Sequence, residues 1–227
     1  MPCANVLIFA IKLTISMKIK TFAFNPFQEN TYILYDETND CVIIDPGCFN
    51  NQEENELSNF IEEYKLNPVR LLNTHCHIDH VLGNKFIEEK YGLKPEYSKN
   101  EIPVMEMAKQ ASMLYEIPYK ESSVAENYIE ENDVVEFGKT KLHLLSVPGH
   151  SPGHLVFINK EDKSIIGGDV LFYGSIGRTD LPLGNHEDLI RNIRSKIFVL
   201  HDDFVVYPGH GPTTTLGFEK QNNPFFT

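Results

Sequence analysis

Four side chains of metal-binding types lie within six positions of the sequence, at His75, His77, Asp79 and His80. Successive side chains of extended backbone point to opposite faces, so His75 and His77 share one side and can chelate the same cation. Asp79 and His80 follow at the turn into an expected helix, where they can face a second cation. Core packing explains this cluster poorly, because buried imidazoles and carboxylates each need polar partners. The spacing therefore predicts a metal site.

Three glycine-containing segments supply further donors, each at the end of an expected strand. They are Pro148-Gly149-His150-Ser151-Pro152-Gly153-His154, Gly167-Gly168-Asp169 and Tyr207-Pro208-Gly209-His210-Gly211. Glycine permits tight turns and a close approach of the backbone, which leaves the His or Asp exposed at the tip of the loop. Each segment alone is ordinary loop chemistry. Their order along the chain, after the first cluster, predicts one site built at the ends of strands.

The elements that must hold these loops are short strands and helices. Residues 19–24, 31–35 and 41–45 predict an antiparallel meander. Helices are expected at 52–65, 81–90, 100–115 and 186–197, and further strands at 69–73, 134–137, 141–147, 155–159, 165–168 and 204–207. The acidic segment 116–132 is expected to be irregular and could cover a cleft. Two strand-rich halves with helices predict an α/β (α+β) fold, a four-layer αββα sandwich of two sheets.

Length and composition are those of one globular domain. The chain has 227 residues, of which 41% are hydrophobic and 23% are charged, so a packed core is expected over residues 17–227. Residues 1–16 are interpreted as a disordered or spurious extension, because Met17 opens the first expected strand. The alternative is a signal peptide formed by the apolar run 6–15, although no basic residue precedes that run.

Charge and cysteine usage restrict the partners and the compartment. The formal net charge of -12 argues against a nucleic-acid partner, since such proteins concentrate Lys and Arg. The apolar run is too short to cross a bilayer, so no membrane partner is expected. Cys3, Cys41, Cys48 and Cys76 form no CxxC pair, which is typical of a reducing compartment and indicates the cytoplasm. The oligomeric state is not readable from the sequence.

The pattern Thr74-His75-x-His77-x-Asp79-His80, followed by His150, Asp169 and His210, resembles the metallo-β-lactamase superfamily, and within it the glyoxalase II-like hydrolases. The resemblance covers nearly the whole chain from Met17. It implies a first metal held by His75, His77 and His150, a second held by Asp79, His80 and His210, and a bridging Asp169. Nitrogen and oxygen donors suit Zn, Fe and Mn alike. Two divalent ions are therefore expected, with zinc preferred, and Cys76 is not expected to be a ligand.

Five further residues are expected around these ligands. Asp45 resembles the strand-end aspartate of the family and, like Thr74 and His154, is expected to orient a ligand from behind, although a plain turn-forming Asp45 is the alternative. Tyr173 and Arg178 follow the bridging aspartate, so they are expected to line the cleft and bind substrate. The alternative is a purely structural loop, held by an ion pair of Arg178 with Asp180 or Asp188.

The resemblance implies a binuclear hydrolase of a small thioester, such as a hydroxyacyl thioester of glutathione or a related thiol. Two cations would supply a bridging hydroxide as the nucleophile, and Asp79 would orient it or move its proton, so no Ser or Cys nucleophile is required. Only residues 211–227 follow His210, too few for the helical domain with which glyoxalase II binds glutathione. The sequence therefore leaves the thiol of the substrate open.

Other functions stay open on the same residues. The run Gly177-Arg178-Thr179-Asp180 also occurs in persulfide dioxygenases, which use one iron in a facial set homologous to His75, His150 and Asp169. A lactonase or another ester hydrolase could use the same metal pair. A purely structural metal domain is disfavoured, because structural zinc sites are closed tetrahedra rich in Cys.

Overall fold

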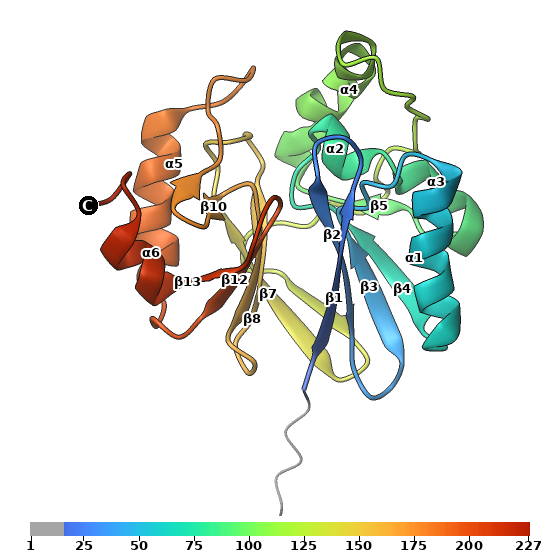
Figure 1. Cartoon of the computed structure of the whole chain (residues 1–227), viewed down its shortest axis with the longest axis horizontal. Coiled ribbons are helices and arrows are strands. Elements are labelled where there is room, and N and C mark those ends of the chain that lie inside the picture. The colour runs from blue at the N-terminus through green and yellow to red at the C-terminus, as the bar shows by residue number, and fades with distance from the viewer. Residues whose placement is uncertain (1–15) are drawn as a thin grey trace, which may run out of the picture.

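Two β-sheets lie face to face at the centre of the molecule, and helices cover their outer sides (Figure 1). The structure is a computed structural model that describes residues 16–227. The first sheet has the order β1-β2-β3-β4-β5, with bounds Lys18–Phe24, Glu29–Tyr35, Asp40–Ile44, Asn67–Leu72 and Pro95–Glu96. The second has the order β13-β12-β9-β8-β7-β6, with bounds Thr214–Thr215, Val205–Pro208, Ser164–Gly168, Leu155–Asn159, Thr140–Ser146 and Val134–Phe137. A small separate hairpin pairs β10 (Leu171–Phe172) with β11 (Ser175–Ile176).

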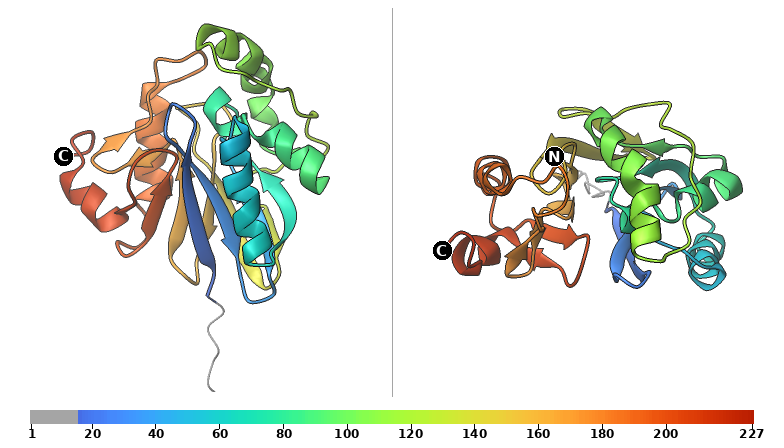
Figure 2. Two further views of the ribbon diagram at one scale, coloured as in Figure 1. Left: turned by 45° about the vertical axis from the view of Figure 1, so that its right-hand side comes forward. Right: turned by 90° about the horizontal axis from the view of Figure 1, so that it is seen from above.

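The helices form the two outer layers (Figure 2). Helices α1 (Asn51–Glu63) and α3 (Asn84–Tyr91) cover the first sheet. Helix α5 (His186–Asn192), the π-helical turn η2 (Ile193–Ile197) and helix α6 (Leu216–Asn222) cover the second sheet. Helix α2 (Ile78–Val81) follows β4, and the 3-10 turn η1 (Lys99–Glu101) and helix α4 (Ile102–Leu114) lie in the long excursion from β5 to β6 that joins the two halves. Within residues 16–227, no helix is long and apolar enough to cross a membrane.

Alternating side chains explain why the sheets pack on both faces. In β8, Leu155 and Phe157 point into the core between the sheets, whereas Val156 and Ile158 pack with the cluster under α5 and η2. On the first sheet, Ile33 of β2 belongs to the cluster beneath α1 and α3. Each sheet therefore has one face against the other sheet and one against helices. The predicted four-layer αββα sandwich is confirmed.

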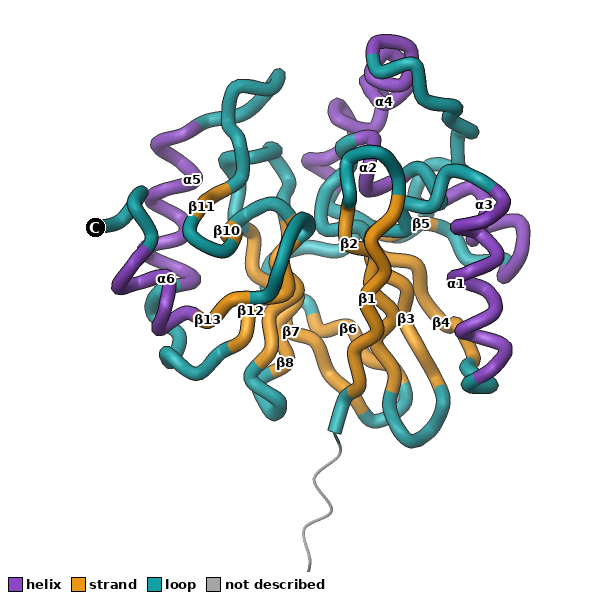
Figure 3. The backbone as a smooth tube through the Cα atoms, in the orientation of Figure 1, coloured by secondary structure: helices purple, strands orange, loops and turns teal. Residues whose placement is uncertain are grey.

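The strands that precede the predicted donors all end on one side of the molecule. Strands β3, β4, β7, β9 and β12 run in the same direction, and the loops that follow them meet at the upper edge in Figure 3. Parallel pairing of β3 with β4 and of β9 with β12 produces this arrangement, because the carboxyl ends of parallel strands share one edge. The fold thus brings distant loops together.

Some elements differ from the prediction. The helix expected at 81–90 is α3, which begins only at Asn84, and the separate turn α2 ends at Val81. Gly83 lies between them: its N–H donates to Pro46 O at 2.7 Å, and a Cβ there would lie 2.5 Å from Cys48 Sγ. The short elements β5, β10, β11, β13 and α6 were not predicted. Segment 116–132 is irregular, as predicted, but it does not line the cleft, which α4 borders instead. The extension predicted at 1–16 lies, apart from Ser16, outside the described residues.

At the opposite edge of the sheets, Asp36 ties the turn after β2 to the turn before β7. Its carboxylate accepts hydrogen bonds from Thr38 N and Oγ1, Lys139 N and Thr140 Oγ1, at 2.6 to 2.9 Å. Burial alone would raise the pKa of Asp36, but the hydrogen bonds from Thr38, Lys139 and Thr140 hold it below its ordinary value. The charged form of Asp36 therefore stabilises the fold.

We expect Asp36→Ala to lower the free energy of unfolding by about 2–3 kcal/mol at pH 7, because it leaves buried donors without an acceptor. A lowered folded-state pKa gives stability that is present above the unfolded pKa of about 3.9 and is lost as pH falls through the folded value. The difference from wild type in urea unfolding should therefore shrink in acid. Glu37→Ala is the control, since Glu37 pairs with Lys139 on the surface. A constant difference down to acid pH would contradict the role of the charge.

Candidate metal centre

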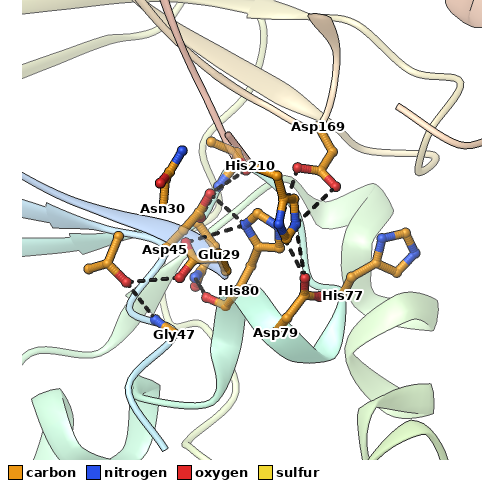
Figure 4. Close-up of polar contacts among 12 residues, drawn as sticks. Glu29, Asn30, Asp45, Gly47, His77, Asp79, His80, Asp169 and His210 are labelled. Atoms are coloured by element: carbon orange, nitrogen blue, oxygen red, sulfur yellow. Dashed lines mark hydrogen bonds and ion pairs between the residues drawn. The ribbon is translucent and has the colours of Figure 1, made fainter. Parts of the chain in front are cut away.

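Seven predicted donor residues meet at the edge where these strands end. His75 and His77 lie in the loop after β4, and Asp79 and His80 lie in α2. His150 follows β7, Asp169 follows β9 and His210 follows β12. Figure 4 shows Asp79, His80, Asp169 and His210 pointing toward one another from these separate segments.

The first group of donors contains three imidazoles. His150 Nε2 lies 3.2 Å from His75 Nε2 and 2.8 Å from His77 Nδ1, so three ring nitrogens converge on one point. Burial, followed by the neighbouring histidines, holds the pKa of His75 well below its usual range. Burial, followed by the nearby His150, lowers the pKa of His77 to about 3. These rings are neutral at pH 7 and offer lone pairs, as metal ligands must.

The second group joins Asp79, His80 and His210. Asp79 Oδ2 lies 3.1 Å from His210 Nε2 and 3.7 Å from His80 Nε2. Although burial opposes it, the Asp79 and Asp169 carboxylates hold the pKa of His80 well above its ordinary value. Burial would raise the pKa of Asp79, but His80 and His210 lower it, so the carboxylate is charged.

Asp169 lies between the two groups. Its Oδ1 atom is 3.4 Å from His80 Nε2, and its Oδ2 atom is 3.5 Å from His150 Nε2 and 3.6 Å from His210 Nε2. One carboxylate therefore approaches donors of both groups, with Oδ1 near His80 and Oδ2 near His150. Charge favours this position, since the surrounding histidines hold the pKa of Asp169 far below its ordinary value despite its burial.

The donor atoms fit divalent cations. His80 Nε2 and Asp169 Oδ1 are buried and have no hydrogen-bond partner among the described residues, although buried polar atoms normally have one. Cations between the converging nitrogens and oxygens would satisfy them. The donor groups found in the described part of the chain contain no cysteine, and Cys76 packs in the apolar cluster beside α4. Nitrogen and oxygen donors are compatible with zinc, iron or manganese.

Asp45, Thr74 and His154 contact the donor residues His80, His75 and Asp169 without belonging to the two donor groups described above. Asp45 Oδ2 lies 3.1 Å from His80 Nδ1, and Asp45 accepts hydrogen bonds from Thr74 N and Oγ1 at 2.7 and 2.6 Å. Thr74 Oγ1 lies 3.0 Å from His75 Nδ1. His154 Nε2 accepts the Asp169 N–H at 3.0 Å, and its ring stacks on His75 at 4.7 Å. Such contacts fix the orientation of a ligand.

Glu101 ties two donor loops together and was not predicted. Its side chain is completely buried, Oε2 accepts the Cys76 N–H at 2.8 Å and Oε1 accepts the Gly153 N–H at 2.6 Å. Cys76 separates His75 from His77, and Gly153 precedes His154. Burial raises the pKa of Glu101, while the two backbone N–H groups favour its charged form. One carboxylate thus holds both loops in register.

Glu29 is a second buried carboxylate that was not predicted. Glu29 Oε1 lies 3.8 Å from His80 Nδ1, and Oε2 accepts a hydrogen bond from Thr31 Oγ1 at 2.9 Å. Burial raises the pKa of Glu29 well above its ordinary value, against the opposing charge of His80. Burial of an acidic residue within a strand would have pointed to a functional role for Glu29. Burial cannot be read from a single sequence, so this residue was missed.

A cleft of about 580 Å³ opens beside the donors. His77, Asp79, His150, Asp169 and His210 line its base. One wall comes from α4, and the other comes from the segment that includes β10, β11 and the loop after them. The volume is that of a site for a small molecule.

The two predicted cleft residues behave differently. Tyr173 does not line the cleft: its side chain is 55% exposed and stacks on Phe218 of α6 with ring centroids 4.8 Å apart, so this expectation is wrong. Tyr173 lies in the turn between β10 and β11, and the preceding residue, Phe172, lines the cleft instead. Arg178 does border the cleft, and its guanidinium makes two hydrogen bonds to Asp180 at 2.7 Å. Its carbonyl oxygen lies 2.7 Å from His150 Nδ1.

Comparisons with known proteins agree with this arrangement. The sequence model of the metallo-beta-lactamase superfamily matches residues 24–210. Hydroxyacylglutathione hydrolase GloC of Haemophilus influenzae is 36% identical over 212 residues, which are 92% of this chain and 98% of that protein. The crystal structure of BLEG-1 B3 metallo-beta-lactamase has a TM-score of 0.85 and 31% identity, and covers 92% of this chain and 100% of that one. The crystal structure of TTHA1623 in a di-iron-bound form has a TM-score of 0.82 and 32% identity, and covers 91% of this chain and 99% of that one.

Proposed function

Because this chain belongs to the metallo-β-lactamase superfamily, we propose that it is a binuclear metal-dependent hydrolase of a small thioester. The observation that carries the proposal is the Asp169 carboxylate, which lies between two groups of donors rather than beside one. A carboxylate in that position suits two cations, as in two-metal hydrolases. The similarity to a protein named hydroxyacylglutathione hydrolase supports a thioester as the substrate.

In this proposal, His75, His77 and His150 would hold one cation, Asp79, His80 and His210 would hold the other, and Asp169 would contribute to both. A bound metal pair supplies Lewis acidity and lowers the pKa of water. Asp79 also borders the cleft, so its Oδ2 can orient the attacking water and hold a proton. The carbonyl carbon gains a bond to oxygen, the carbon–sulfur bond breaks, and the thiolate leaves. Asp45, Thr74 and His154 keep the donors in place.

For the metal we propose zinc, with iron and manganese as alternatives that the same donors accept. Iron is kept because TTHA1623, at 32% identity, was solved in a di-iron-bound form. We propose a reducing compartment, the cytoplasm, because Cys41, Cys48 and Cys76 are all buried and unpaired with one another. We also propose that the partner is a small-molecule thioester and neither nucleic acid nor membrane.

The test is the metal content per chain of anaerobically purified protein, measured beside three activities. We expect two metal ions and thiol release from a hydroxyacyl thioester, with no oxygen uptake on glutathione persulfide and little hydrolysis of a β-lactam. One iron per chain with oxygen consumption and no thioester hydrolysis would replace the proposal with a persulfide dioxygenase. Preferred turnover of the β-lactam, as the name of BLEG-1 would suggest for that protein, would also overturn it.

A further inference from the structure

Helix α4 turns an apolar face toward the cleft. The apolar residues of this face recur at helical spacing and are Val104, Met107, Ala108, Ala111, Leu114 and the adjoining Tyr115, and Gln110 is the polar residue of α4 in the same lining. Leu114 lines the cleft although it is 76% exposed, so it stands at the mouth rather than in the core. An exposed Leu on a cleft wall gains from contact with an apolar ligand.

The opposite wall is apolar as well. Phe172, Ile176, Leu181 and Pro182 line it, and Figure 1 shows α4 and the segment from β10 to α5 on opposite sides of the gap between the two halves. Both walls continue to the donors, since His77 and Asp79 belong to the same lining. A group held between the walls can therefore be attached to a carbonyl placed at the donors.

Charged partners for an anionic ligand are scarce on these walls. Among the residues that line the cleft, all within the described range, Arg178 is the one Lys or Arg, and Asp180 already binds its guanidinium. Glutathione carries two carboxylates, which would have to compete with Asp180 for Arg178 or remain unpaired. An uncharged ligand meets no such opposition.

We propose that the substrate carries an uncharged, apolar substituent beside the scissile carbonyl, which binds along the α4 face, and that glutathione is not the preferred thiol. This inference rests on the proposed function, because hydrolysis of a thioester supplies its main readout. The apolar substituent can belong to the acyl part or to the thiol part. In both cases an apolar group lies between the two walls of the cleft. The substrates described below distinguish an apolar acyl part from an apolar thiol part.

The first experiment compares kcat/KM of the metal-loaded protein for matched thioesters. One series has acetyl, butyryl and hexanoyl groups on N-acetylcysteamine, a second has lactoyl groups on N-acetylcysteamine, butanethiol and glutathione. We expect kcat/KM to rise along one series by up to about fourfold for each methylene that becomes buried. We also expect the glutathione thioester to be the poorest of the lactoyl series. A flat response to chain length, or a preference for glutathione, would overturn the inference.

A pair of variants tests whether α4 is the wall that matters. Leu114→Glu places a charge at the cleft mouth and should lower kcat/KM for the best apolar thioester about tenfold, mainly through KM. Met113→Glu is the matched control, since Met113 is 68% exposed on the same helix but does not line the cleft, and it should stay within about twofold of wild type. Equal effects of the two substitutions would exclude a specific role for the α4 face.

Binding separates this inference from the proposed function. Isothermal titration calorimetry compares S-hexyl-N-acetylcysteamine, S-methyl-N-acetylcysteamine and S-methylglutathione, thioethers that cannot be hydrolysed. Tightest binding of the hexyl compound, weakened by Leu114→Glu, supports the apolar wall even if no thioester is turned over, in which case the proposed function alone has failed. Hydrolysis of thioesters together with equal binding of the three thioethers leaves the function standing and refutes the apolar substituent.

Discussion

Replacing Asp169 with Asn is expected to lower the metal content from two ions per chain to one or none, and to reduce kcat/KM for a thioester at least about 100-fold. The Asp169 oxygens lie 3.4 Å from His80 Nε2 and 3.5 Å from His150 Nε2, so one carboxylate serves both donor groups. Asn keeps the shape of the side chain, but it loses the charge and replaces one acceptor oxygen with a hydrogen-bond donor. An amide NH2 cannot bind a cation, so one side of the centre loses its ligand.

The measurement combines elemental analysis with thermal unfolding in the presence and absence of added zinc. A metal that binds only the folded state raises the melting temperature according to its affinity, so zinc should stabilise wild type more than Asp169→Asn. Asp203→Asn is the control, because Asp203 is an exposed residue that pairs with Lys163 on the surface of the second half. Two tightly bound ions in Asp169→Asn, with wild-type activity, would contradict the bridging role.

The residues that converge at the candidate metal centre could be predicted from the sequence because residue type and strand-end position are local properties. The alternation that puts His75 and His77 on one side requires only extended backbone, and glycines next to Asp169 and His210 mark turns. Strand and helix periodicity likewise predicted most of the fold, because the runs of apolar residues follow the layers in which they are buried. What the sequence could not supply was the exact placement of short elements, such as the break at Gly83.

The residues that sequence reasoning missed or misplaced depend on contacts between distant segments. Glu101 accepts an N–H from Gly153, which is 52 positions away, and nothing near Glu101 in the sequence indicates that partner. Tyr173 was expected in the cleft because it follows Asp169, but it lies in the turn after the two-residue strand β10, and Phe172 lines the cleft. The sequence did not predict this short hairpin, so the direction of the side chains in its turn requires the structure.

We expect Glu101→Gln to lower the free energy of unfolding by about 2–3 kcal/mol and to weaken metal binding by about 10- to 100-fold. Each Glu101 oxygen accepts one backbone N–H, from Cys76 at 2.8 Å and from Gly153 at 2.6 Å. The amide of Gln has one oxygen, so its NH2 group must face a second donor in a fully buried site. Either loop can shift to relieve that clash, and both loops carry proposed metal ligands. These are His75 and His77 in one loop and His150 in the other.

Urea unfolding of the metal-free protein and a zinc titration of the folded protein separate two roles for Glu101. If Glu101 only stabilises the fold, Glu101→Gln lowers the free energy of unfolding and leaves the zinc affinity unchanged. If it positions the donor loops, both quantities fall, since a displaced imidazole loses affinity without leaving the site. Glu106→Gln, at an exposed residue of α4, controls for the loss of charge and should change neither. Because one carboxylate holds the loops of both His77 and His150, we expect the affinity of the first donor group to fall most.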